Sequence, residues 1–498
     1  MKLPEGKLIP LILGPVLGLI VWLIMPKTPE TPMLAKAAAA AVWMGVWWLT
    51  EAVPLAVTSL LPLVFFPMLG VMSAKAIAPL YMNDVVFLFI GGFIVALAMQ
   101  KWGLHKRIAL IIILTIGGGP RRTLLGFMAA SAFLSMWISN TATAMMMMPI
   151  AMAVLNRYDE LLGKERAKGF AIALLLGVAH ASTAGGIGTL VGTPPNLVFA
   201  SIFHSTFPNA PEISFVSWMM FALPFSITLF FTIWGILNIY IPRDLKLTGT
   251  RDVFKKEFKE MGKPVYEEKV VLWVFLALAL LWIFRKNLTL GAFIIPGWSN
   301  LLPFPSYVGD GTVAIALGVL LFLIPSKKKG EAIIDWATAR KLPWSIVLLF
   351  GGGFALAGAV RTSGLADWIG MQMSGLSSLP PAVMTGSIAM IITFSTELTS
   401  NTATTQMILP VLAAVGVSIG RNPLFLMVPA TLSASCAFMM PVATPPNAIV
   451  FGTGRLRIID MAKSGILINI AGAILIVIFV HAFGHHFFGA NTLPDWVN

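Results

Sequence analysis

The 498-residue chain contains one cysteine, Cys436, and few charged side chains. A single cysteine excludes a disulfide within the chain and a metal site built from cysteines. Charged residues make up 11% of the sequence and hydrophobic residues 57%, and the mean hydropathy is +0.87. These values exclude an ordinary soluble domain and indicate an all-α polytopic membrane protein.

Uncharged segments close to the roughly 20 residues that cross a bilayer recur along the chain. Examples are residues 8–25, 52–74, 213–241, 422–454 and 464–480. The first of these resembles a signal peptide, but further apolar segments follow it. We therefore interpret it as an uncleaved signal-anchor helix.

The net charge of +13 comes from lysines and arginines in short connections between apolar segments. These basic connections are residues 101–107, 121–122, 157–168, 243–269, 327–341 and 455–463. If Lys2 and Lys7 lie in the cytoplasm, counting spans places every basic connection on the cytoplasmic side and the C-terminus outside. The excess of positive charge then follows the positive-inside rule, and we predict no nucleic-acid partner.

The most informative pattern is a polar element that occurs twice within uncharged sequence. Ser-Asn-Thr stands at residues 139–141 and 400–402, each time followed by Ala-Thr and with a proline ten residues after the serine. Gly-Gly-Phe at residues 91–93 and 352–354 shares the same offset of 261 positions. A Thr-Pro-Pro-Asn run follows each tripeptide, now at an offset of 251. This regularity predicts an internal repeat.

The length of the uncharged segment around each tripeptide predicts a re-entrant hairpin. Residues 123–156 form an uncharged stretch of 34 residues with arginines on both sides. Two legs of about 16 residues reach about 24 Å, which is short of the roughly 30 Å apolar core. The second copy begins near Pro380 and returns near Arg421. Counting spans predicts that the first hairpin enters from the cytoplasm and the second from the outside. We therefore expect an inverted-topology repeat whose tips meet near the midplane of the membrane.

The Thr-Pro-Pro-Asn runs predict breaks in the helices that follow the hairpins, because paired prolines remove backbone donors and free nearby carbonyls. Hydroxyl and amide groups at the tips can donate to carboxylate oxygens. The tip oxygens and the freed carbonyls suit a hard monovalent cation. Since no lysine or arginine lies in either tip, co-bound cations would offset the charge of an anion. The pattern predicts a transport site for an anion and cations.

Other polar residues allow more than one interpretation. Glu397, next to the second tip, is either a proton site or a structural hydrogen-bond partner, and His180 is interpreted as structural. The cluster of His481, His485 and His486 suits an interfacial position better than a metal site. The chain has no HExxH, P-loop or GxSxG signature, so we predict that it is not an enzyme and keep an anion channel as an alternative.

These motifs resemble those of the divalent anion/sodium symporter family, the INDY-type dicarboxylate and citrate transporters. The resemblance covers nearly the whole chain and includes WLTEAVPLAVTSLLP at residues 48–62 and FIGGFIVALAMQKWGLHKRI at residues 89–108. It also includes both Ser-Asn-Thr tripeptides and both Thr-Pro-Pro-Asn runs.

The resemblance implies a homodimer in the bilayer with about 11 transmembrane helices, two re-entrant helical hairpins and an elevator mechanism. Scaffold parts are expected at residues 1–120 and 270–378, and transport parts at residues 121–242 and 379–498. Residues 243–269 between them are interpreted as a cytoplasmic amphipathic linker.

The resemblance also implies the site residues. The dicarboxylate is expected to contact Ser139, Asn140, Thr141, Thr193, Pro194, Ser400, Asn401, Thr402, Thr444 and Pro445. One sodium site is expected at Ser135, Ser139, Asn140 and Gly192, and the other at Thr396, Thr399, Asn401 and Ala443. Thr399 stands where some relatives carry another residue, which matters little if its backbone carbonyl is the ligand.

We therefore expect a secondary-active, Na⁺-coupled symporter of C4-type dicarboxylates such as succinate, malate and fumarate in the plasma (bacterial inner) membrane. Two alternatives remain open at this point. One is a sodium-independent dicarboxylate exchanger, and the other is a transporter of citrate or another divalent anion.

Overall fold

A computed structural model describes residues 8–245, 250–290 and 293–497. This part of the chain is mostly helical, and its sheet is a single antiparallel hairpin of β1 (Leu288–Leu290) and β2 (Phe293–Ile295). The all-α prediction therefore describes this part of the chain apart from one short hairpin. Lys2 and Lys7, on which the predicted orientation rests, lie outside the described residues, as do residues 246–249 of the predicted linker.

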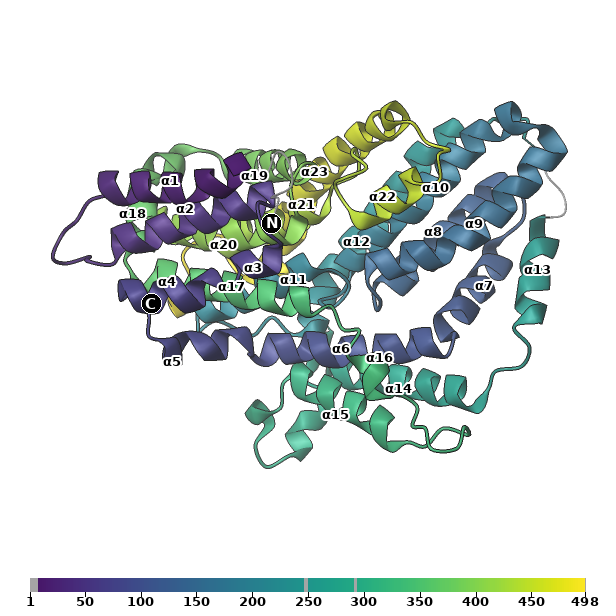
Figure 1. Ribbon diagram of the computed structural model, residues 1–498, viewed down its shortest axis with the longest axis horizontal. Helices are drawn as coiled ribbons and strands as arrows, with labels where there is room; N and C mark the ends of the chain where they lie inside the picture. The colour runs from purple at the N-terminus through teal and green to yellow at the C-terminus, as the bar shows by residue number, and fades with distance from the viewer. Residues whose placement is uncertain (1–7, 246–249, 291–292, 498) are drawn as a thin grey trace.

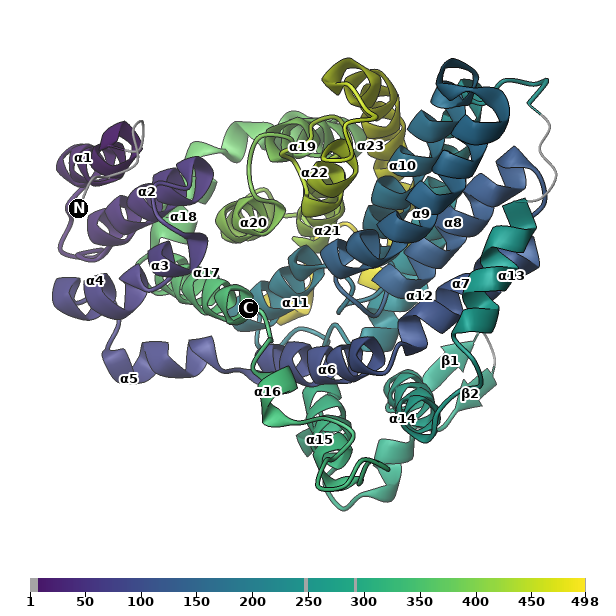
Figure 2. The same cartoon turned by 45° about the vertical axis from the view of Figure 1, so that its right-hand side comes forward.

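The N-terminal helices form one group on the left of Figures 1 and 2, beside two helices from the second half of the chain. Trp48 and Phe66 are fully buried in the core of this group. The helices are α1 (Leu8–Ile24), α2 (Leu34–Thr50), α3 (Leu55–Thr58), α4 (Leu61–Leu69) and α5 (Ala74–Ile77).

Two helices then lead from this group across the molecule. They are α6 (Asp84–Lys101) and α7 (Leu104–Ile116), separated by Gly103 with φ +72°. A Cβ atom on Gly91 would lie 2.4 Å from the backbone carbon of Ala314, so only glycine permits this approach of α6 to α15 (Asp310–Leu323).

The next five helices contain the first tripeptide and the first Thr-Pro-Pro-Asn run. They are α8 (Pro120–Ser135), α9 (Asn140–Leu162), α10 (Lys164–Ile187), α11 (Pro194–Thr206) and α12 (Phe215–Leu237). Helix α10 is buried over nearly its whole length. It packs against α8, α9, α12 and the later helix α22 (Pro445–Phe451).

The second half begins with α13 (Thr250–Glu260), which buries Phe254 against the ring of Phe127 at a centroid distance of 5.7 Å. Its later helices are α14 (Tyr266–Ile283), α15, α16 (Trp336–Ala339), α17 (Trp344–Thr362) and α18 (Leu365–Gln372). The last five are α19 (Pro381–Thr396), α20 (Asn401–Ser418), α21 (Leu424–Ser435), α22 (Pro445–Phe451) and α23 (Ile458–Phe488).

Several helix boundaries follow the internal repeat predicted from the sequence. Helices α8 and α19 begin at Pro120 and Pro381, and helices α9 and α20 begin at Asn140 and Asn401, which are both pairs at the offset of 261. Gly364 separates α17 from α18 with φ +77°, as Gly103 does between α6 and α7. Equivalent residues therefore start these helices, and equivalent glycines separate α6 from α7 and α17 from α18.

Five helices of the described residues are long and apolar enough to cross a membrane, by length and composition. They are Ala74–Lys101, Lys164–Ile187, Phe215–Tyr240, Trp344–Thr362 and Ile458–Phe488. Shorter apolar helices of 10–17 residues accompany them, including Leu8–Ile24 and Leu34–Thr50. The molecule is thus a helical, multi-pass membrane protein.

Candidate substrate and cation site

Each Ser-Asn-Thr tripeptide starts a helix at the turn of a helical hairpin. Ser139 Oγ accepts a hydrogen bond of 3.2 Å from the N–H of Ala142, and Ser400 Oγ accepts one of 3.4 Å from the N–H of Ala403. The remaining N–H groups of a first helical turn carry partial positive charge. Both tips can therefore bind carboxylate oxygens without a lysine or arginine.

Each Thr-Pro-Pro-Asn run marks the predicted break in the following helix. Residues 188–193 separate α10 from α11, and residues 436–444 separate α21 from α22. Thr193 and Thr444 are extended, with φ of −145° and −142°, and a proline occupies the first position of the helix that follows. Proline fits there because the N–H of that position has no partner within the helix.

The asparagine that ends each run holds the unwound segment in place. Asn196 Nδ2 donates to the carbonyl of Thr189 at 2.7 Å, and Asn447 Nδ2 donates to the carbonyl of Met440 at 3.0 Å. Both asparagines are fully buried. Their hydrogen bonds to the unwound segments were not predicted from the sequence, although the repetition of the asparagine in both runs is a signal for such a role.

The first tip and the first break meet at Asn140. The side chain of Asn140 fits its surroundings when its amide nitrogen donates to Ser135 Oγ and to the carbonyls of Gly192 (3.2 Å) and Ser182 (3.3 Å). A Cβ atom on Gly186 would lie 3.0 Å from the carbonyl oxygen of Gly192, so glycine permits this convergence. Three of the four residues predicted for the first sodium site thus lie together.

A second contact joins the same tip and break. Thr189 Oγ1 donates to the carbonyl of Met136 at 2.6 Å and accepts a hydrogen bond of 3.1 Å from the N–H of Gly192. This hydroxyl ties the position of Gly192 to the turn of the hairpin. No pattern in the sequence indicates this contact of Thr189.

The second cluster forms around Asn401. Thr396 Oγ1 donates to Asn401 Oδ1 at 2.6 Å and lies 3.1 Å from the carbonyl of Ala434. Thr399 uses its hydroxyl elsewhere, since Oγ1 donates to the carbonyl of Ser395 at 2.9 Å. The same hydroxyl also lies 2.8 Å from Thr404 Oγ1, so it is engaged with neighbouring residues of the tip.

Glu397 fixes the second break to the second tip. Its carboxylate accepts hydrogen bonds from the N–H groups of Phe438 (2.7 Å), Met439 (2.9 Å) and Met440 (2.9 Å). Asn469 Nδ2 on α23 donates to it at 2.7 Å. Of the two roles considered for Glu397, this geometry supports the structural hydrogen-bond partner, because the four bonds leave little of its acceptor capacity for other groups.

The remaining predicted residues lie in the first helical turns or at the breaks. Thr141 and Pro194 are half-buried, Thr193, Thr402, Thr444 and Ala443 are buried, and Pro445 is exposed. The ring of His180 on α10 contacts that of Phe438, with centroids 5.1 Å apart. This contact packs α10 against the unwound segment that follows α21. The clusters around Asn140 and Asn401 are therefore carried by helices that contact each other.

Equivalent residues of the two repeats differ in exposure. Met145 on α9 is 55% exposed, whereas its counterpart Gln406 on α20 is fully buried. Ala448 on α22 is exposed, whereas its counterpart Leu197 on α11 is fully buried. The α9/α22 half of the site is therefore open and the α11/α20 half is closed.

Polar contacts close the α11/α20 half. Gln406 Nε2 donates to the carbonyl of Leu349 on α17 at 2.7 Å, and Asn83 Nδ2, which precedes α6, donates to Ser201 Oγ on α11 at 2.9 Å. A Cβ atom on Gly353 would lie 2.5 Å from Gln406, so α17 and α20 are in close contact.

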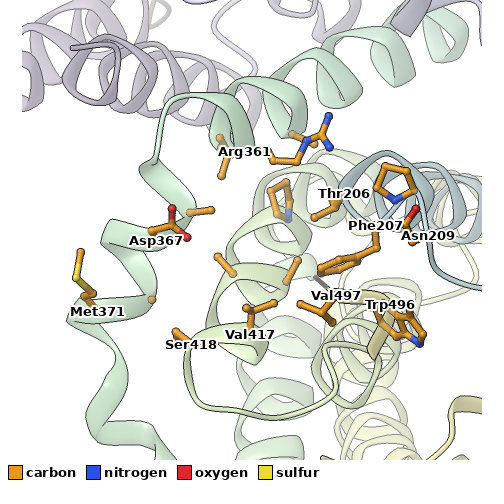
Figure 3. Close-up of a pocket in the computed structure, with 18 residues that line it drawn as sticks. Thr206, Phe207, Asn209, Arg361, Asp367, Met371, Val417, Ser418, Trp496 and Val497 are labelled. Atoms are coloured by element: carbon orange, nitrogen blue, oxygen red, sulfur yellow. The ribbon is translucent and has the colours of Figure 1, made fainter. Parts of the chain in front are cut away.

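A pocket of about 750 Å³ lies beyond these contacts, between α11, α17, α18 and α20 (Figure 3). Phe207, Arg361, Asp367, Ser418 and Trp496 contribute to its wall. Its lining contains none of the residues predicted for the site.

Comparison with known proteins gives consistent matches. The model of the family described as "Sodium:sulfate symporter transmembrane region" matches residues 6–489. The sodium-dependent dicarboxylate transporter SdcS of Staphylococcus saprophyticus is 45% identical over 484 residues, which cover 96% of this chain and 91% of that protein. SdcS of Staphylococcus aureus is 43% identical with the same coverage.

The fold also has a match among solved structures. The YdaH transporter of Alcanivorax borkumensis aligns with a TM-score of 0.56 at 13% identity, over 97% of this chain and 98% of that chain. This similarity concerns the fold alone. The match to the family model extends over nearly the whole sequence, and the chain therefore belongs to the sodium:sulfate symporter family.

Proposed function

We propose that the protein is a secondary-active symporter that carries a C4-type dicarboxylate together with Na⁺ across the plasma (bacterial inner) membrane. The observation that carries the proposal is the pair of uncharged clusters around Asn140 and Asn401. Membership of the family and the transport named for the two SdcS relatives support it.

The composition of the clusters supports coupling to cations. A dianion in a site without lysine or arginine is costly to bury unless its charge is offset. We assign the carboxylates to the first turns of α9 and α20, with Thr193, Pro194, Thr444 and Pro445 at the breaks. We assign the two Na⁺ ions to Ser135, Ser139, Asn140 and Gly192 and to Thr396, Thr399, Asn401 and Ala443.

We propose an elevator mechanism in which residues 121–242 and 379–498 form the transport part. Residues 1–120 and 270–378 form the scaffold part, and residues 243–269 link the two halves. In the predicted orientation, the open α9/α22 half faces the cytoplasm and the closed α11/α20 half faces outward. The contacts of Gln406 with Leu349 and of Asn83 with Ser201 then join transport part to scaffold part on the outer side.

The ion pairs support this orientation. Arg455 pairs with Asp159 at 2.7 Å and Arg166 pairs with Asp244 at 2.9 Å, so basic connections predicted to be cytoplasmic lie next to one another. Trp496 contacts the ring of Phe207 at a centroid distance of 5.2 Å, which groups the C-terminus with the end of α11. We propose eleven spans with two re-entrant hairpins, a cytoplasmic N-terminus, an outer C-terminus and a homodimer.

Uptake of labelled succinate into proteoliposomes tests the proposed function. We expect uptake under an inward sodium gradient and a large loss of uptake when choline replaces sodium. Malate and fumarate are expected to compete with succinate. Uptake that is unchanged in choline would contradict sodium coupling and favour a sodium-independent exchanger.

The same vesicles separate the other candidates. Competition by sulfate or citrate that exceeds competition by malate would assign a different divalent anion, and the family description makes sulfate the first competitor to include. Flux without saturation or trans-stimulation would favour an anion channel.

A further inference from the structure

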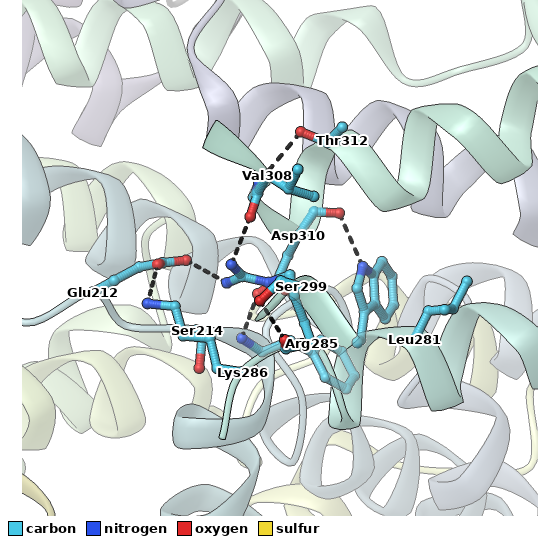
Figure 4. Close-up of polar contacts among 12 residues, drawn as sticks. Glu212, Ser214, Leu281, Arg285, Lys286, Ser299, Val308, Asp310 and Thr312 are labelled. Carbon is cyan, nitrogen blue, oxygen red and sulfur yellow. Dashed lines mark hydrogen bonds and ion pairs between the residues drawn. The ribbon is translucent and has the colours of Figure 1, made fainter. Parts of the chain in front are cut away.

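A cluster of charged side chains joins the connection between α11 and α12 to the end of α14 and the start of α15 (Figure 4). Glu212 lies in that connection. Its carboxylate contacts Arg285 Nη2 at 2.6 Å and Lys286 Nζ at 2.5 Å. Both cations follow α14 directly, so one acidic side chain from the proposed transport part meets two basic side chains of the proposed scaffold part.

Arg285 has a second acidic partner that belongs to its own part of the protein. Arg285 Nε contacts Asp310 Oδ1 at 2.5 Å, and the other carboxylate oxygen of Asp310 accepts a hydrogen bond of 2.7 Å from the N–H of Phe215 at the start of α12. Arg285 is 2% exposed, whereas Glu212 is 39% exposed. Removal of Glu212 would therefore leave the buried guanidinium paired with Asp310.

Glu212 is unusual among the acidic residues of the described chain. The ion pairs found there lie within the scaffold part, within the transport part, or involve the linker at residues 243–269, apart from those of Glu212. Motion of the transport part along the membrane normal would separate Glu212 from Arg285 and Lys286. Motion would leave the other ion pairs within each part intact.

The carboxyl of Glu212 is held in its charged form. Burial raises the pKa of Glu212, but the hydrogen bond from Lys286 and the charges of Arg285 and Lys286 outweigh this effect and hold the pKa below its ordinary value. The carboxyl of Glu212 is therefore charged at neutral pH.

We propose that Glu212 is a latch that stabilises the conformation with the outer side closed. The inference rests on the proposed elevator mechanism, and it goes further by assigning an outer-side ion pair to the balance between the two end states. When the transport part moves outward, Glu212 leaves both cations and is hydrated, while Asp310 still neutralises Arg285. Because no buried charge is left unpaired, the latch can open in every transport cycle.

Two matched valines report the two states. Val191 in the first break is 8% exposed and Val442, its counterpart in the second break, is 75% exposed. In a Cys436→Ser background, a cysteine at Val191 is labelled from outside only when the outer side opens. The rate of its reaction with a membrane-impermeant maleimide in right-side-out vesicles measures the outward-open population.

We expect Glu212→Gln to raise this labelling rate about fivefold. This factor corresponds to the upper end of the stabilisation measured for exposed ion pairs. Lys286→Gln should raise it by a smaller factor, since Arg285 still holds Glu212. Glu160→Gln is the matched control because it removes an ion pair of 3.0 Å with Arg157 inside the transport part. That variant should leave the rate unchanged.

The latch and the proposed function can fail separately. The labelling requires no substrate, so it tests the latch even if the unmodified protein does not take up succinate. Unchanged or slower labelling in Glu212→Gln, with normal uptake by the unmodified protein, would overturn the latch alone. Should Glu212→Gln not fold, Lys286→Gln decides the question in the same direction. A second readout is the external succinate concentration for half-maximal uptake, which should fall by up to about fivefold as the outward-open fraction rises.

Discussion

The two repeats of the molecule have the same local structure but differ in how they pack against the rest of the protein. Helices start at equivalent residues, and an asparagine holds each unwound segment through an equivalent carbonyl. Yet Val191 is buried and Val442 is exposed. The amino-acid pattern therefore determines the local structure of each repeat, whereas the exposure of equivalent residues depends on how each repeat packs against the rest of the protein.

The repeats also differ in how the tip is tied to the break. In the first repeat the hydroxyl of Thr189 reaches the carbonyl of Met136. In the second repeat the residue equivalent to Met136 is Glu397, whose carboxylate collects three backbone N–H groups and the amide of Asn469. At this equivalent position, a neutral hydrogen bond in the first repeat thus corresponds to a network around a charged group in the second.

The largest expected effect comes from removing the asparagine of either tip. Asn140→Ala and Asn401→Ala should each lower sodium-driven succinate uptake about 100-fold, since each removes a ligand shared by the anion and a cation. Similar losses would mean that both repeats contribute to one site. One control is the expression level of each tip variant. The other is uptake by Asn300→Ala, which changes an exposed asparagine far from the tips in sequence. Normal uptake by either tip variant would refute the site assignment.

A smaller effect is expected in a direct test of the difference in exposure. In a Cys436→Ser background, Val442→Cys should react with maleimide from the cytoplasmic side at least about tenfold faster than Val191→Cys reacts from outside. That ratio corresponds to an opening free energy of about 1.4 kcal/mol or more. Equal rates would show that the two halves are equally accessible in solution. The identical parent residue makes the two variants matched controls of each other.

The next prediction compares the two contacts that join a tip to a break, those of Glu397 and of Thr189. Glu397→Gln places an amide group among N–H donors and leaves buried donors without an acceptor, so the sodium concentration for half-maximal uptake should rise about tenfold. Thr189→Val removes one neutral hydrogen bond and should raise it about threefold. Sodium titration of succinate uptake gives both values. A larger effect of Thr189→Val than of Glu397→Gln would reverse the proposed ranking.

The last prediction concerns stability rather than transport, at equivalent glycines of the proposed scaffold part. A Cβ atom would lie 2.4 Å from the backbone of Ala314 at Gly91 and 2.5 Å from the side chain of Ser59 at Gly352. Gly91→Ala and Gly352→Ala should therefore each cost about 1–3 kcal/mol through overpacking. Both should lower the melting temperature of the purified protein, and Gly235→Ala, where nothing lies within 4 Å, should not.

Features that depend on local chemistry were predictable from the sequence. The tips and breaks stand out because polar residues and prolines are exceptional within uncharged segments, and the constant offset revealed the repeat. Contacts between remote segments were not predictable in this way. Glu212 and Arg285 are 73 positions apart, and nothing in either neighbourhood indicates the other. The same holds for the contact of Glu397 with residues 438–440 and for the closed α11/α20 half.

Reciprocal binding of succinate and sodium to the purified protein tests the shared site most directly. If both ligands use Asn140 and Asn401, sodium must raise the affinity for succinate, and succinate must raise the affinity for sodium by the same factor. Titration calorimetry in sodium and in choline measures both affinities. We predict a clear and equal enhancement in the two directions. Succinate binding of the same affinity in choline and in sodium would contradict a common site for the dianion and its cations.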